Sequence, residues 1–284
     1  MEYCSPQQVA KAYKTACLAE IEALKPGNVH IFSDGHGMTV YDFIKSAEAV
    51  CGVVSMANLS LGQRILYSVE ATQKAVACNT NLGIILLCAP LVHAVLAYPT
   101  GTLHQRLQQV LVQTTVEDAQ YAFDAIALAK PGGLGRVKQH DVHQKANCNL
   151  LAAMQASAPH DLIAMQYANG FEAIFKVGIP ILAADASVRD AWLTTKLYLT
   201  LLSTFPDSHI ARKHNLAMAD DIQYQAREHL TMFNLLDNPK LYLSQLLTWD
   251  NQLKQKQVNP GTCADLTVAS LFAYALDRLI QYED

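Results

Sequence analysis

The sequence predicts an all-α fold, and three observations carry that prediction. Apolar side chains recur with the 3.6-residue period of a helix, as Val9, Tyr13, Ala16 and Ile21 illustrate. Motifs typical of helix N-termini recur along the chain. No run of residues alternates apolar and polar side chains as a half-buried strand does. We therefore expect a single compact domain over residues 1–284, built from roughly ten or eleven helices.

Capping motifs place the individual helices. Ser5 is followed by Pro6 and Gln8, which suit the N-cap, N1 and N3 positions of a helix that runs to Leu24. The same pattern predicts helix starts at Thr39, with Asp42 three residues on, and at Thr115, with Asp118 three residues on. Further starts are expected at Ser60, at Asp141 with Gln144, at Ser187 with Asp190, and at Thr262 with Asp265.

The most apolar stretch runs from Leu82 to Ala97. It is shorter than the roughly 20 residues that a membrane-spanning helix needs, and it contains Pro90 and His93. We therefore predict a buried core helix there and no membrane partner. The first four residues have neither the basic nor the apolar region of a secretion signal, so a cytoplasmic location is expected.

Composition argues against other classes of protein. A net charge of -4 and a pI of about 6.2 give no broad basic surface, so no nucleic-acid partner is expected. The seven cysteines include no C-x-x-C pair and lie mostly in apolar helical patterns, which is typical of reduced packing residues. The sequence leaves open whether the chain forms a homo-oligomer.

Loops on a rigid helical scaffold often hold functional residues. Five loops stand out: residues 25–37, 79–81, 131–135, 205–213 and 259–262. The first combines Lys25 with two histidines and Asp34, a mixture that suits an anionic ligand and a metal ion, because lysine binds phosphate and Mg²⁺ prefers carboxylates with phosphate oxygens. The same segment also fits an ordinary helix-to-helix loop with a Pro-Gly turn. Asp42 likewise fits a helix cap as well as a metal ligand.

Together these loops resemble the triphosphoribosyl-dephospho-coenzyme A synthase family over nearly the whole chain. Five blocks of residues carry the resemblance. They are Glu20 with Lys25-Pro26-Gly27-Asn28-Val29-His30, then His36 with Met38, Asp42, Phe43 and Ser46, then Asn79-Thr80-Asn81-Leu82-Gly83, then Pro206-Asp207-Ser208 with Arg212-Lys213, and finally Pro260-Gly261-Thr262-Cys263-Ala264-Asp265-Leu266.

The sequence departs from the family pattern in two of these blocks. Asn81 and Leu82 stand where the family has histidine and lysine, and His214 and Asn215 stand where glycines are usual. The Lys-Pro-Gly-Asn-Val-His form of the first block also suggests a divergent branch. We therefore keep open an alternative function as a related nucleotide-dependent enzyme of cofactor biosynthesis in one-carbon metabolism.

The resemblance implies a transferase that moves the 5-triphosphoribosyl group of ATP onto the 2′-hydroxyl of dephospho-coenzyme A, or of a related acceptor, and releases adenine. It implies ATP and dephospho-coenzyme A as partners and Mg²⁺ on the triphosphate. Departure of adenine from the ribose builds positive charge on C1, so the site needs a carboxylate, a proton donor to the base and a proton acceptor for the hydroxyl.

The family blocks imply the site residues. The expected metal ligands or charge-stabilising carboxylates are Glu20, Asp42, Asp207 and Asp265, of which Asp265 also fits a capping box with Thr262. The expected phosphate-binding cations are Lys25, Arg212 and Lys213. Ribose and phosphate oxygens are expected to be oriented by Asn28, Asn79, Asn81 and the backbones of Gly27 and Gly261, and His30 or His36 is the expected proton-transfer group.

Two other classes of function remain open at this stage. The missing lysine in the Asn79 block suits a nucleotide-binding protein without catalysis, which would bind ATP and release no adenine. A purely structural helical protein would have no pocket bordered by Glu20, Asp42 and Asp207.

Overall fold

The protein is described here by a computed structural model that covers residues 4–132, 141–184 and 190–281. Across these residues the chain is helical, and the remainder forms loops with two isolated β-bridges and no strand. The predicted all-α class is therefore confirmed. The helices are α1 (Pro6–Glu22), α2 (Val40–Val54), α3 (Leu61–Val76), α4 (Leu82–Ala97), α5 (Leu103–Val112), α6 (Val116–Ala129), α7 (Leu150–Ser157), α8 (Leu162–Asn169), a π-helical turn (Ala173–Gly178), α9 (Ile179–Ala184), α10 (Ala191–Thr204), α11 (Ser208–Lys213), α12 (Leu216–Asn234), a 3₁₀ turn (Pro239–Tyr242), α13 (Leu243–Gln255) and α14 (Gly261–Gln281).

The described ranges contain fourteen α-helices, so the predicted number of ten or eleven was too low. The excess comes from short helices. α7 and α8 have eight residues each, and α9 and α11 have six. A helix of two turns presents too few apolar positions for its period to be recognised in a window of about 11 to 18 residues.

Most predicted capping boxes are present. Ser5, Thr39, Ser60 and Thr115 each cap a helix, and in each case the residue three positions on closes the box. Two predicted starts were wrong, and one lies outside the described residues. Asp141 opens a turn rather than a helix. Thr262 lies inside the first turn of α14 and does not cap it; its hydroxyl accepts a hydrogen bond from the His209 backbone N–H of α11 at 3.2 Å instead. Ser187 is not described, whereas Asp190 itself caps α10.

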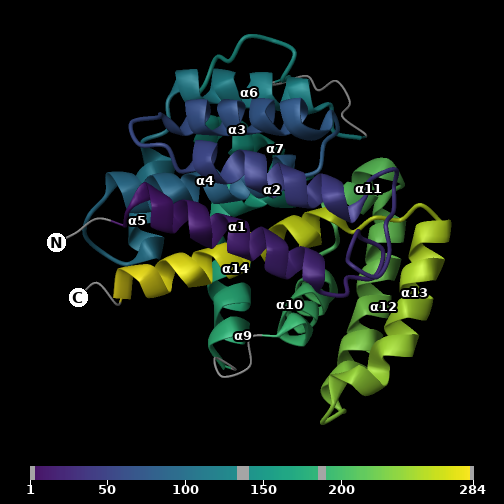
Figure 1. Ribbon diagram of the computed structural model, residues 1–284. Coiled ribbons are helices and arrows are strands. Elements are labelled where there is room, and N and C mark those ends of the chain that lie inside the picture. Colours follow the sequence, from purple (N-terminus) through teal and green to yellow (C-terminus); the bar gives the residue numbers. More distant parts are fainter. Residues whose placement is uncertain (1–3, 133–140, 185–189, 282–284) are drawn as a thin grey trace.

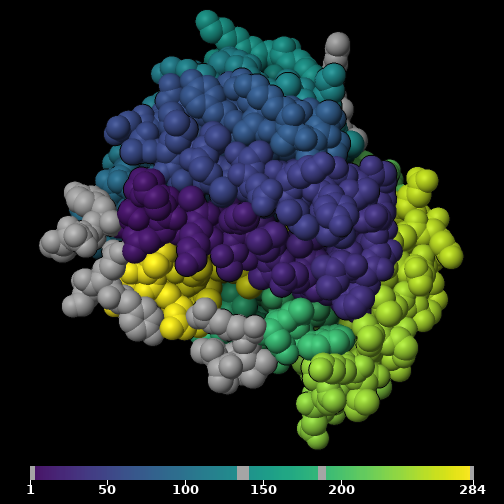
Figure 2. Space-filling view, in the orientation of Figure 1, coloured from purple at the N-terminus to yellow at the C-terminus, as the bar shows by residue number. Residues whose placement is uncertain are grey.

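Two central helices organise the fold. α4 is buried along nearly its whole length, as predicted for residues 82–97, because its sequence is apolar on every face. The long α14 packs against α1, α4 and α10. Figure 1 shows α2, α3 and α6 stacked on one side of this centre, and Figure 2 shows α1 and α2 covering much of α14.

A second, smaller group of helices lies beside this core. α12 and α13 run side by side and project away from the rest of the molecule (Figure 1). Their apolar residues form a buried cluster separate from the main one, and α10 and α14 contribute residues to both clusters. The two parts are therefore joined through shared helices. No helix in the described ranges is both long and apolar enough to cross a bilayer.

Candidate active site

A large pocket opens where the N-terminal ends of several helices meet. Its volume is about 1270 Å³. The wall is formed by the C-terminal end of α1, the N-terminal ends of α4, α8 and α14, and the short helix α11. Of the residues predicted for the site, seven line this pocket: Glu20, Asn28, Asn79, Asn81, Arg212, Gly261 and Asp265.

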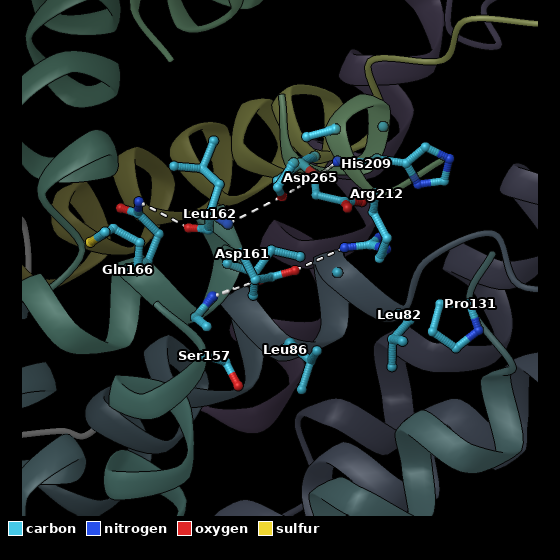
Figure 3. Close-up of a pocket in the computed structure, with 18 of the residues that line it drawn as sticks. Leu82, Leu86, Pro131, Ser157, Asp161, Leu162, Gln166, His209, Arg212 and Asp265 are labelled. Atoms are coloured by element: carbon cyan, nitrogen blue, oxygen red, sulfur yellow. Dashed lines mark hydrogen bonds and ion pairs between the residues drawn. The ribbon is translucent and has the colours of Figure 1, made fainter. Parts of the chain in front are cut away.

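Asp265 is the carboxyl group that the pocket leaves most available. It points into the pocket from the first turns of α14 (Figure 3). Its side chain makes no hydrogen bond or ion pair with any described residue. Burial and the nearby charges of Glu20 and Asp207 raise the pKa of Asp265 well above its usual value, although Arg212 opposes this shift. A carboxyl group in this setting retains its proton at higher pH than usual and can act as an acid.

Gly83 explains how Asp265 fits against the N-terminal end of α4. A Cβ atom at position 83 would lie 2.0 Å from Oδ2 of Asp265 and 2.6 Å from its Cγ. Real Cβ atoms do not approach other atoms this closely, so only glycine leaves room for the carboxyl group. The glycine in the Asn79 block and the aspartate in the Pro260 block are therefore parts of one local arrangement.

Glu20 lines the pocket and is held from behind by Lys25. The Lys25 Nζ atom lies 2.6 Å from Glu20 Oε1, and it also donates hydrogen bonds to Asn28 Oδ1 at 2.9 Å and to the Val29 carbonyl at 2.5 Å. An ammonium group has three donors, and all three are used here. Lys25 is fully buried and does not line the pocket. It supports the wall instead of facing a phosphate.

The loop after α1 is fixed to α13 by Asp250. The Asp250 carboxylate accepts a hydrogen bond from the Gly27 backbone N–H at 2.8 Å, lies 3.2 Å from His30 Nε2 and forms an ion pair with Lys254 at 3.0 Å. The Phe32 backbone N–H donates to His30 Nδ1, so the ring is neutral and carries its proton on Nε2. Burial lowers the pKa of His30, in agreement with this state.

His30 and His36, the two predicted proton-transfer groups, therefore hold the loop in place. His36 Nε2 donates to the Gly27 carbonyl at 2.8 Å, and neither histidine lines the pocket. Gly27 adopts a φ of +85°, and a Cβ there would lie 2.8 Å from Pro260 and 2.9 Å from Leu253. Asn28 Nδ2 bonds to Asn259 Oδ1 at 2.8 Å, and these two residues do border the pocket.

Asp207 ties two helix starts together behind the pocket. Oδ1 accepts hydrogen bonds from the backbone N–H groups of His209 and Ile210, and Oδ2 accepts one from the N–H of Cys263 at 2.8 Å. The side chain is fully buried and does not line the pocket. Both carboxylate oxygens are therefore occupied by backbone donors, which leaves Asp207 as a cap for α11 and a link to α14.

The cationic side of the pocket is formed by α11. Arg212 and His209 line the pocket, whereas Lys213 is exposed and lies outside it. Burial lowers the pKa of His209 to about 4, and the neighbouring charges of Arg212 and Lys213 act in the same direction. His209 is therefore neutral near pH 7, and Arg212 supplies the permanent positive charge.

Comparisons with known proteins identify the family. The sequence profile described as ATP:dephospho-CoA triphosphoribosyl transferase matches residues 6–284. The chain belongs to this family. A crystal structure from Archaeoglobus fulgidus, described as a triphosphoribosyl-dephospho-CoA synthase, shares the fold with a TM-score of 0.62 and 23% sequence identity, over 83% of this chain and 97% of the other. No curated protein gives a significant match.

Membership of the triphosphoribosyl transferase family makes the chain a transferase. The motif blocks that carry the resemblance lie around one pocket. All five blocks contribute residues to the pocket or to its supporting wall. The two departures also lie there. Leu82 lines the pocket where the family has lysine, while Asn81 is buried and accepts a hydrogen bond from the Thr72 hydroxyl at 3.0 Å. Of the glycine-rich segment 131–135, residues 133 onward lie outside the described part of the chain.

Sequence reasoning missed several residues of the candidate pocket. Asp161, His209, Asn259 and Thr262 all line it, but none was predicted as a site residue. Thr262 and Asn259 lie inside or beside a recognised block, so the block could have indicated them. Asp161 had a weaker signal, which is that an aspartate before an apolar run is a good helix cap.

The described residues suit Mg²⁺ in one way only. None of them form a group of three or more histidine, cysteine or acidic side chains that could hold a metal ion by themselves. Mg²⁺ commonly binds through one or two carboxylates together with phosphate oxygens of a substrate. Of the four predicted ligands, Glu20 and Asp265 line the pocket and fit that mode, whereas Asp207 and Asp42 do not line it.

Asp42 closes the capping box of α2. Its Oδ2 atom accepts hydrogen bonds from the Thr39 backbone N–H and from the Thr39 hydroxyl, both at 2.8 Å. These bonds lower the pKa of Asp42. Its neighbour Phe43 lines the pocket, but Asp42 does not.

We expect Asp42→Ala to reduce the free energy of unfolding by about 1 kcal/mol, the usual loss for a helix cap. Adenine release should remain within about threefold of the wild-type rate, because truncation at a cap disturbs little beyond the first turn. Urea denaturation and the rate of adenine release measure the two effects. A complete loss of activity in a folded protein would instead show that Asp42 has a catalytic role.

Proposed function

We propose that this chain transfers the 5-triphosphoribosyl group of ATP to the 2′-hydroxyl of dephospho-coenzyme A, or of a closely related acceptor, at the pocket described above. The observation that carries the proposal is Asp265, a carboxyl group with raised pKa and no hydrogen-bonding partner among the described residues, which shares a pocket with the cationic Arg212. The pocket volume of about 1270 Å³ exceeds the roughly 300–1,000 Å³ usual for one small ligand, which suits two substrates bound together.

The positive charge of Arg212 determines the orientation of ATP, the donor substrate, in the pocket. Arg212 offers a guanidinium group, which pairs well with phosphate oxygens, so the triphosphate is expected beside α11. The ribose then extends toward Asp265 and Glu20, which line the same pocket. This orientation brings the bond between C1 of the ribose and the adenine nitrogen to the carboxyl groups.

The proton balance of the reaction can be met by Asp265 alone. As the C1–N9 bond breaks, its electron pair stays with adenine, and protonated Asp265 donates a proton to the departing base. The resulting carboxylate stabilises positive charge on C1. The acceptor hydroxyl then forms the new C1–O bond and returns its proton to Asp265, as an acid/base carboxyl does in glycoside hydrolysis.

Glu20 plays a different part in this proposal. Its Oε1 is paired with Lys25, and its Oε2 has no hydrogen bond among the described residues, so this oxygen could complete the coordination of Mg²⁺. Bound Mg²⁺ would neutralise part of the charge of the triphosphate. The negative charge of Glu20 also keeps the proton on Asp265 by raising its pKa.

Free adenine is the product that tests the proposal. Purified protein is incubated with ATP and Mg²⁺, with and without dephospho-coenzyme A, and adenine is detected by chromatography. Adenine that appears only with the acceptor supports the proposed reaction. ATP binding without adenine under either condition would favour a non-catalytic nucleotide-binding protein, for which the replacement of lysine by Leu82 in the pocket is the motivating observation.

We expect Arg212→Gln to raise the KM for ATP by about 10- to 100-fold, since a hydrogen bond to a charged group contributes about 1.5–3 kcal/mol. The kcat should fall much less, because the triphosphate is bound equally in the ground state and the transition state. The matched control is Lys213→Gln, which removes a neighbouring exposed charge outside the pocket. Equal effects of the two variants on the KM would mean that the net positive charge of α11, rather than a direct contact from Arg212, determines ATP binding.

A further inference from the structure

Arg212 is held on two sides, by groups from different segments. Its Nη1 donates to Asp161 Oδ2 at 2.9 Å, and its Nε donates to the carbonyl of Gly132 at 3.2 Å. The Nη2 atom has no hydrogen-bonding partner among the described residues. Figure 3 shows Asp161 and Arg212 pointing toward one another inside the pocket, with Asp265 and His209 on one side of the pair and Leu86 on the other.

Asp161 divides its two oxygens between two tasks. Oδ1 accepts a hydrogen bond from the Ala164 backbone N–H at 2.9 Å and thereby caps α8. Only Oδ2 faces Arg212. The cap and the ion pair can therefore be separated by mutation, because asparagine caps a helix about as well as aspartate but carries no charge.

The ion pair is accessible from the pocket. The side chains of Arg212 and Asp161 are 27% and 30% exposed, so solvent screens their attraction and the pair is weak. A triphosphate carries several negative charges and offers more acceptor oxygens to the same guanidinium group. It is therefore the stronger partner for Arg212, while the carboxylate of Asp161 repels it.

We propose that Asp161 is a positioning residue that competes with the triphosphate for Arg212 and so limits the affinity for the donor. This inference rests on the proposed function, in which Arg212 binds the triphosphate. Asp161 holds the guanidinium at the pocket wall with Nη2 free to meet the first phosphate. Full engagement of Arg212 then exchanges the carboxylate for phosphate oxygens.

Inorganic tripolyphosphate is the probe that isolates this effect from catalysis. Its dissociation constant is measured by calorimetry for the wild type and for Asp161→Asn, at low and at physiological ionic strength. We expect Asp161→Asn to bind tripolyphosphate about 5- to 10-fold more tightly at low salt, and the gain should shrink as salt screens the removed repulsion. The KM for ATP should fall in the same direction, while kcat changes little.

Two further variants separate the possible causes. Asp190→Asn is the matched control, because Asp190 also caps a helix through Oδ1 and has no ion pair with a described residue. It should leave tripolyphosphate binding unchanged. In the Arg212→Gln background, the gain from Asp161→Asn should fall to less than half, because most of it arises from the competition for the guanidinium group.

Unchanged or weaker binding of tripolyphosphate by folded Asp161→Asn would overturn the inference, and so would an undiminished gain in the Arg212→Gln background. Because the probe contains no adenine and no ribose, this result is independent of the transferase assay. Tighter binding by Asp161→Asn in a protein that releases no adenine would refute the proposed reaction but leave the competition for Arg212 standing.

Discussion

Asp265→Asn is expected to slow adenine release by about 10²- to 10⁴-fold, the usual contribution of a general acid or base. Asparagine has nearly the same shape as aspartate but can neither give up nor receive the proton that the reaction moves. The KM for ATP should change by less than about threefold, since an interaction made only in the transition state affects kcat rather than substrate binding. Steady-state kinetics of adenine release give both numbers.

A control on the same helix distinguishes chemistry from stability. Asp277 lies 12 residues further along α14, about 18 Å away at 1.5 Å per residue, and accepts a hydrogen bond from Gln281. Asp277→Asn should retain wild-type kinetics. If Asp265→Asn keeps more than a tenth of the wild-type kcat, Asp265 is not the acid and base of the reaction, and Glu20 becomes the carboxyl group to test.

The expected pH dependence of kcat follows from the raised pKa of Asp265. Its proton is needed for the departure of adenine, so activity should be retained from acidic pH up to the raised pKa and should fall as the pH increases through it. A carboxyl group with an ordinary pKa would lose its proton, and the activity with it, at much lower pH. The descending limb of the kcat profile should be absent from the residual activity of Asp265→Asn.

Helices were predictable from the sequence where an apolar run was long or where two residues of a capping box marked the start. Residues 82–97 form α4 at the predicted limits, because a continuous apolar run flanked by polar residues leaves few alternatives. Ser5 and Thr115 begin helices as predicted, since each cap is reinforced by a partner three residues on. Short helices such as α11 escaped prediction because one or two turns carry no recognisable period.

The sequence blocks that converge on the candidate pocket were also predictable, but the direction of their side chains was not. A motif places residues in the same neighbourhood without showing which side of the wall they face. Lys25 and Asp207 lie directly behind the pocket wall, and their side chains do not line the pocket. Each is fully hydrogen-bonded to groups that come together only in the folded chain. Asp161 comes from outside the five blocks, and it meets Arg212 only because α8 and α11 converge in space.

Lys25→Met should be the most destabilising single change at the site, with a loss of about 3–5 kcal/mol in the free energy of unfolding. The mutation removes the only cation that forms an ion pair with Glu20 among the described residues, and it leaves a carboxylate that is 4% exposed without compensation. It also leaves the side chain of Asn28 and the carbonyl of Val29 without their shared donor. Denaturant unfolding followed by circular dichroism measures the loss.

The double variant Glu20→Gln/Lys25→Met tests the cause of this loss. Methionine resembles the lysine stem in shape, and glutamine needs no counterion, so the double variant should be more stable than Lys25→Met by at least about 2 kcal/mol. Equal stability of the single and double variants would show that the lost donors to Asn28 and Val29, rather than the uncompensated charge, account for the effect. The single Glu20→Gln change should be milder than Lys25→Met, because an amide oxygen still accepts a hydrogen bond from the ammonium group. The order of the three stabilities therefore reports whether Lys25 serves mainly to keep Glu20 ionised at the pocket wall.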